Sequence, residues 1–317
     1  MQYKFLFCLA CMLSVVSVCA AAPFLTEDAS TLEKDQVIFK SKVIFEKFTK
    51  IRNPLLFDED LPEELTGIDV ERDVWLVPVE IRAGLAQNFT LCLSAFYMYE
   101  ALAATAWGKP GVSDGLYSLS ASGFSRIAVK GLYRLVKEEG GIPGISVLVG
   151  TSFPLGDEDY CAEDGQLKLR VPLGQRGVSI SLWEAISKRF DSVRLHLNLG
   201  YELCLPYTQK LDSQGNVLSV VRSIDPGDRA VYNIAMEKDF KALCFVAELN
   251  GYVARDAKQN TVNISGSGRH VLQALLGLEF RPAAKTDLQI GFLGTLLSSG
   301  GNRDYYYGPV LGLNQRF

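Results

Sequence analysis

The chain has 317 residues, with 32 Lys+Arg against 36 Asp+Glu, a formal net charge of −4 and 48% apolar residues. These values exclude a disordered chain and most basic nucleic-acid binders. The 28 glycines, 17 Phe and 13 Tyr favour β-structure over a helical bundle.

Residues 1–21 have the pattern of a secretory signal peptide. One positive charge, Lys4, precedes an apolar run over Phe5–Cys19, and the small residues Ala20–Ala22 follow it. The run is short for a membrane-spanning helix, which needs about 20 residues. We therefore expect cleavage after residue 21. A periplasmic N-terminal segment over 22–35 then precedes a single domain over 36–317.

Apolar residues alternate with polar ones through most of this domain. In the clearest case, 193–207, every second residue from Val193 to Tyr207 is apolar, and Arg194 and Glu202 lie on the other face. Strands of soluble proteins run about five or six residues, whereas a tilted strand needs roughly nine to eleven to cross a bilayer. The length of the alternation predicts a transmembrane antiparallel β-barrel.

Similar runs predict about twelve strands. They lie near 36–48, 75–85, 89–100, 123–136, 144–155, 177–188, 193–207, 229–237, 242–253, 268–280, 288–297 and 305–317. In 36–48, Ile38 and Ile44 fall on the polar face, and in 177–188 the pair Trp183 and Glu184 breaks the alternation. A count of ten or fourteen therefore stays open.

The connections between these strands alternate between short turns and longer loops. That layout, with an even strand count, is typical of bacterial outer-membrane barrels. It predicts an outer-membrane protein of a Gram-negative cell with both termini in the periplasm and with membrane lipids around the barrel.

The last predicted strand ends the chain on an aromatic residue. Its alternation over Leu311 and Leu313 and its terminal Phe317 resemble the C-terminal signal that the barrel-assembly machinery recognises, although Gln315 departs from that pattern. The three tyrosines 305–307 suit an aromatic girdle at the opposite end of the strand.

Several short stretches of the mature chain resemble the outer-membrane barrel family labelled as phenol-degradation (MetA-pathway) proteins. The stretches are Pro23–Thr26 with Thr31–Lys34, Val79–Leu85, Val149–Asp157, Leu195–Tyr201 and Gly312–Phe317. The resemblance implies a barrel for uptake of small molecules, aromatic or apolar ones among them. It brings no agreed catalytic or binding residues.

Strand parity assigns six acids, five basic residues and one histidine to the lumen. They are Glu80, Arg82, Glu100, Arg126, Lys130, Arg134, Arg194, His196, Glu202, Glu237, Glu248 and Glu279. One hypothesis is that they line a narrow pore and set its selectivity. The alternative is that Glu–Arg pairs bridge the lumen and plug it, because a twelve-stranded barrel is intermediate between filled small barrels and open porins.

Two smaller features bear on the chemistry. A disulfide between Cys161, in a loop, and Cys204, near the outer end of its strand, is open in an oxidising compartment. His196 faces inward by parity, and no serine in a nucleophile motif marks a partner for it. The sequence indicates no metal site and no cofactor.

We therefore predict a passive channel or transporter for a small-molecule solute, with no nucleic-acid partner. An alternative is a surface-exposed barrel that acts as an adhesin or antigen with a plugged lumen, because several loops exceed 20 residues. An outer-membrane lipid enzyme ranks below both.

Overall fold

The computed structural model describes residues 25–49, 65–108, 115–155, 160–164, 167–171, 177–211, 220–240, 242–263, 267–283, 285–300 and 305–317. Among these residues, no helix is long and apolar enough to cross a membrane.

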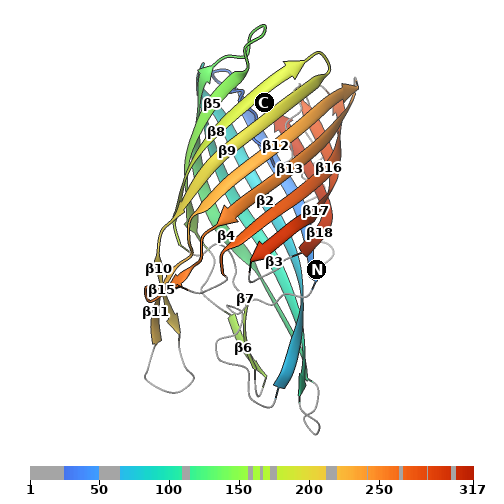
Figure 1. Ribbon diagram of the computed structural model, residues 1–317. Helices are drawn as coiled ribbons and strands as arrows, with labels where there is room; N and C mark the ends of the chain where they lie inside the picture. The colour runs from blue at the N-terminus through green and yellow to red at the C-terminus, as the bar shows by residue number, and fades with distance from the viewer. Residues whose placement is uncertain are drawn as a thin grey trace.

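Twelve antiparallel strands close into one barrel (Figure 1). They are β1 Val37–Thr49, β2 Leu65–Ala86, β3 Phe89–Gly108, β4 Gly115–Val136, β5 Gly144–Pro154, β8 Ser179–Phe190, β9 Val193–Cys204, β12 Arg229–Phe240, β13 Leu243–Ala254, β16 Arg269–Ala283, β17 Thr286–Gly300 and β18 Tyr305–Arg316. The first and last strands pair from Ile38 with Arg316 to Thr49 with Tyr305, which closes the barrel. Each of the twelve barrel strands therefore has a partner on both sides, as a hydrocarbon environment requires.

The predicted strand count and order are confirmed, including the two strands with imperfect alternation. In β1, Ile38 and Ile44 point inward and are buried, so the irregularity is an apolar patch on the lumen side. In β8 the alternation itself is intact. Trp183 points inward, and Glu184 is a carboxylate on the outer face between Leu182 and Ile186.

The barrel has a turn end, where the five short connections lie, and a loop end, where the longer ones lie. Three strands reach further toward the loop end than predicted: β2 begins at Leu65, β3 ends at Gly108 and β4 begins at Gly115. Backbone pairing there continues without apolar alternation. One strand is shorter than predicted: β9 ends at Cys204 and not at Tyr207. Pro206 has no N–H that could donate to the neighbouring strand.

The loops contain small strands of their own. β6 Tyr160–Asp164 and β7 Leu167–Val171 form one hairpin, and β10 Tyr207–Leu211, β11 Val220–Asp225, β14 Lys258–Gln259 and β15 Val262–Asn263 form a four-stranded sheet. Both extend beyond the barrel at the loop end (Figure 1).

The outer face of the barrel carries exposed aliphatic side chains between two rings of aromatic ones. The ring toward the turn end contains Tyr133, Phe190, Phe240, Phe280 and Phe317. The ring toward the loop end contains Trp75, Tyr97, Phe124, Tyr201 and Tyr307. Exposed apolar side chains on this scale need a hydrocarbon solvent, and aromatic girdles at two levels match the two interfaces of a bilayer.

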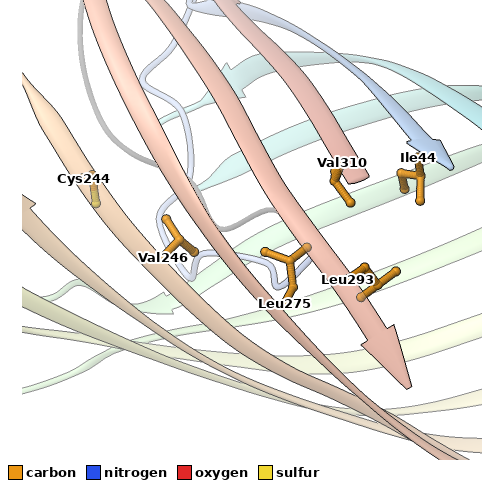
Figure 2. Packing of buried hydrophobic residues seen from close by; sticks show 6 residues of the cluster. All are labelled: Ile44, Cys244, Val246, Leu275, Leu293 and Val310. Carbon is orange, nitrogen blue, oxygen red and sulfur yellow. The ribbon is translucent and has the colours of Figure 1, made fainter. Parts of the chain in front are cut away.

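One part of the lumen wall is apolar. Figure 2 shows the six residues of this cluster, which come from five adjacent strands: Ile44, Cys244, Val246, Leu275, Leu293 and Val310. Leu25 packs against them. The interior therefore combines the charged residues assigned by parity with an apolar patch.

Candidate functional site

The residues that precede β1 run inside the barrel. We call Leu25–Gln36 the plug segment, because its backbone and side chains bond to inward-facing residues of β2, β3, β4, β5, β8, β9 and β13. This position differs from the periplasmic location predicted for 22–35, a range of which the structure describes residues 25–35. A segment that contacts seven of the twelve strands lies across the middle of the lumen.

The tip of the plug segment is held by one carboxylate. The backbone amides of Leu25 and Thr26 both donate to Glu248 Oε2, each at 2.9 Å, and the Thr26 hydroxyl donates to the same oxygen at 3.0 Å. Glu248 is buried on β13. A buried carboxylate needs several donors, and here the plug segment supplies them.

The next residue, Glu27, connects opposite parts of the wall. Its amide donates to Asn198 Oδ1 at 2.7 Å, and Asn198 Nδ2 donates back to its carbonyl at 2.9 Å. Its carboxylate lies 2.6 Å from Arg82 Nη2 and 3.4 Å from Lys130 Nζ. Asn198 therefore replaces the backbone partner that a strand would offer, and the two cations neutralise the charge.

Asp28 and Ala29 are held in the same way on the β5, β8 and β9 side. Asp28 lies 3.1 Å from Arg194 Nη1, and the Ala29 amide donates to Ser187 Oγ at 2.9 Å. The hydroxyl of Ser146 donates to the Ala29 carbonyl. Small inward polar side chains thus satisfy a backbone that has no secondary structure of its own.

The last residues of the plug segment, Glu33–Gln36, form its stem and pass Gly84 of β2 on the way to β1. The Asp35 amide donates to the Gly84 carbonyl, and the Gly84 amide donates to the Gln36 carbonyl, both at 2.9 Å. A Cβ at position 84 would lie 1.9 Å from the carbonyl oxygen of Glu33. Only glycine leaves room for this approach of two backbones.

Two carboxyls of the plug segment, outside the membrane-spanning strands, have lowered pKa values. Burial alone would raise the pKa of Glu27, but the charges of Arg82, Lys130 and Lys40 outweigh it and hold that pKa below the usual 4.5. For Asp28, burial is likewise outweighed by Arg194 and His196, which hold its pKa below 3.8. These carboxyls therefore stabilise the plugged state in their ionised form.

Acid should consequently loosen the plug. A carboxyl whose pKa is lowered in the plugged state contributes its full stabilisation at pH values above its free pKa. This contribution is lost as the pH falls from the free pKa toward the lowered pKa. We expect channel openings to become more frequent below about pH 4.5. Planar-bilayer recording across this range, with heat-modifiable gel mobility to verify the barrel at each pH, would measure it. Openings that stay equally rare at all pH values would contradict the assignment.

All twelve residues predicted for the lumen have inward parity in the barrel. Five of them contact the plug segment, namely Arg82, Lys130, Arg194, His196 and Glu248. Five acids have partners on the wall: Glu80 with Arg82, Glu100 with Arg72, Glu202 with Arg229, Glu237 with His196 and Glu279 with Arg281. Arg126 stacks on Phe96, with 4.1 Å to the ring centroid, and Arg134 bonds to the β2–β3 turn.

His196 has a serine partner that sequence reasoning missed. Its Nδ1 lies 2.8 Å from Ser187 Oγ, and its Nε2 lies 3.4 Å from Glu237 Oε1. This order resembles a hydrolytic triad. Ser187, however, is only 2% exposed, and its oxygen also accepts the Ala29 amide, so a substrate carbonyl has no access to it. Ser187 and His196 instead contact the plug segment, at Ala29 and Asp28 respectively.

The remaining predicted residues are those of the last strand and the two cysteines. Leu311 and Phe317 are exposed on the outer face, whereas Leu313 is buried. Their role as an assembly signal stays a prediction. Cys204 is buried with a free thiol in this structure, and the side chain of Cys161 lies outside the described residues.

The plug segment separates cavities on its two sides. Toward the loop end lie two adjoining cavities of about 350 and 250 Å³. Both are lined by Leu25, Glu27, Phe96, Arg126 and Lys130. Toward the turn end lies a cavity of about 460 Å³, lined by Asp28, Leu32, Lys285 and Arg316 among others. The plug segment thus lies between cavities on its loop-end and turn-end sides.

No family model and no curated protein matches this sequence. Solved structures do share its fold. An outer membrane channel from Pseudomonas putida F1 is 13% identical with a TM-score of 0.62, and the match covers 94% of this chain and 100% of that one. The likeness is one of fold.

Two autotransporter domains are also similar. The transport unit of AIDA-I from Escherichia coli is 9% identical with a TM-score of 0.52, covering 92% of this chain and 94% of that one. The translocator domain of NalP from Neisseria meningitidis is 11% identical with a TM-score of 0.50, covering 90% of each. The barrel therefore has the architecture of outer-membrane proteins.

Proposed function

We propose that this chain is an outer-membrane channel for passive uptake of small molecules, and that its plug segment closes it in the state described. The observation that carries the proposal is the plug segment itself. It is joined to the wall covalently only where it continues into β1, and hydrogen bonds and ion pairs hold the rest of it in the lumen, with cavities on both sides. Polar contacts of this kind exchange with water at modest cost, so the closed state can open.

The proposed cellular setting follows from the same features. The aromatic girdles support insertion in a bilayer, and the shared fold supports the outer membrane as its location. We place the turn end and both termini in the periplasm, with the barrel-assembly machinery acting on the last strand. The resemblance to the phenol-degradation family and the apolar patch beside Leu25 support aromatic or apolar solutes.

The first test is conductance of the refolded mature protein in planar bilayers, with heat-modifiable gel mobility as evidence of a folded barrel. We expect a channel that is closed most of the time and shows brief, discrete openings. A folded barrel that stays silent even after the plug segment is removed would overturn the proposal.

A substitution at the tip of the plug segment sharpens this test. In Glu248→Gln a neutral carbonyl oxygen replaces the carboxylate that accepts from Leu25 and Thr26. The contacts lose their charge assistance, and a hydrogen bond to a charged group is worth about 1.5–3 kcal/mol against about 0.5–1.5 kcal/mol for a neutral one. We expect openings at least about tenfold more frequent than in the wild type. Glu279→Gln is the matched control, because this equally buried carboxylate bonds to Arg281 and Gln289 of the wall. If both variants open equally often, the contact of Glu248 with Leu25 and Thr26 does not hold the channel closed.

A second candidate function is display of a surface structure. The four-stranded sheet of β10, β11, β14 and β15 and the β6–β7 hairpin form ordered elements outside the barrel, which suits an adhesin or antigen with a permanently closed lumen. Silence of every plug variant, together with binding to host or neighbouring cells, would favour this function over transport.

A further inference from the structure

The cavity of about 350 Å³ on the loop side of the plug segment combines aromatic rings with positive charge. Its walls include Phe96, Trp183 and Tyr252, from β3, β8 and β13. Its volume lies at the lower end of the range for small-molecule sites, and aromatic walls with a few placed polar groups are typical of them. Shape and lining therefore suit a single small ring.

The charges around this cavity favour an anion. Arg126, Lys130 and Arg229 line it together with two carboxylates, Glu27 and Glu202, which leaves one positive charge in excess. The adjoining cavity of about 250 Å³ adds Lys40, Lys42 and Arg82 but only one further acid, Glu80. The approach to the plug segment from the loop end is therefore positively charged.

The exposure of these side chains shows which charges a ligand meets. The carboxylates are covered, since Glu27 and Glu202 are 13% and 17% exposed. Glu27 pairs with Arg82 and Lys130, and Glu202 pairs with Arg229 and accepts from the Ser179 hydroxyl. Lys130 and Arg229 are 31% and 30% exposed. A ligand in the cavity contacts the cations more readily than the acids.

The local backbone keeps Lys130 and Trp183 directed into the cavity. A Cβ at Gly150 would lie 2.9 Å from Lys130 Cγ, and a Cβ at Gly200 would lie 2.7 Å from Trp183 Cγ. Glycine at these two positions gives the lysine and the indole room to lie against the neighbouring strands.

We propose that this cavity binds a small aromatic monocarboxylate, with its carboxylate at Lys130 and its ring among Phe96, Trp183 and Tyr252. The inference rests on the proposed channel function and names its solute class. A charge-assisted hydrogen bond fixes the carboxylate, and stacking on aromatic faces holds the ring. The bound solute then lies directly against Leu25 and Glu27 of the plug segment.

Tryptophan fluorescence can test binding without any conductance measurement. Trp183 becomes the sole reporter after Trp75→Phe and Trp107→Phe, because the protein has three tryptophans. We expect benzoate to change its emission saturably, and benzyl alcohol, a neutral molecule of similar size, to bind at least about tenfold more weakly. Lys130→Met should weaken benzoate binding by at least about tenfold, whereas Lys285→Met, in the turn-side cavity, should leave it unchanged.

Equal affinity for benzoate and benzyl alcohol, or benzoate binding that Lys130→Met does not affect, would overturn this assignment. Absence of saturable binding in a folded barrel would do the same. These outcomes are separate from those of the channel test. If the protein conducts but does not bind benzoate, only the proposed solute class is refuted. If the folded barrel binds benzoate but does not conduct, only the proposed channel function is refuted.

Discussion

Removal of residues 22–34 from the mature chain is expected to convert a mostly closed barrel into one that stays open. The deletion takes away the segment that bonds to Glu248, Asn198 and Ser187, and water can then satisfy these inward polar groups. We expect long-lived open states and a conductance several-fold above the brief openings of the wild type, measured on single channels in planar bilayers.

The truncated barrel also offers a reversal experiment. A synthetic peptide of residues 22–36 should block it, and the block should arise only from the side of the turn end, where the stem of the plug segment leaves the lumen beside Gly84. Heat-modifiable mobility shows that the truncated chain has folded. A conductance equal to that of the wild type would mean that another part of the chain closes the lumen.

The second large effect is expected for Gly84→Ala. The added methyl group would meet the Glu33 carbonyl at 1.9 Å, so the stem of the plug segment must move away from β2. It then loses the two hydrogen bonds by which Asp35 and Gln36 pair with Gly84. We expect frequent openings with an intact barrel, because the strand partner of Gly84 is Thr90 and this pairing does not involve the new methyl group.

Gly294→Ala is the matched control for this variant. Position 294 lies in β17, and a Cβ there would have no atom within 4 Å. Its channel behaviour and its unfolding temperature should equal those of the wild type. If Gly84→Ala also behaves like the wild type, the stem adapts without leaving the lumen, and the close backbone approach has no part in gating.

These expectations also separate the two roles proposed for the lumen side chains. The two hypotheses for these side chains are a charged pore lining and a lumen bridged by Glu–Arg pairs. The contacts combine both: Arg82 bonds to Glu80 of the wall and to Glu27 of the plug segment. A residue such as Arg82 lines the open pathway only after Glu27 has left.

The sequence by itself determined the barrel. Each strand must present apolar side chains to lipid at every second position, and this requirement is local, so it is visible as alternation in runs such as 193–207. The same periodicity placed Glu248, His196 and Lys130 on the inner face. Even Ile38 and Trp183, which disturbed the pattern, kept their parity in the structure.

Only the tertiary structure decided what fills the lumen. The plug segment has no periodicity, because its backbone is satisfied by single side chains, Asn198, Ser187 and Ser146, that lie more than a hundred residues away. In the sequence, acidic residues such as Glu27 and Asp28 ahead of the first strand look the same as those of a solvent-exposed segment. Their pairing with Arg82, Lys130 and Arg194 exists only once the sheet has closed, because closure brings β2, β4 and β9 around one axis.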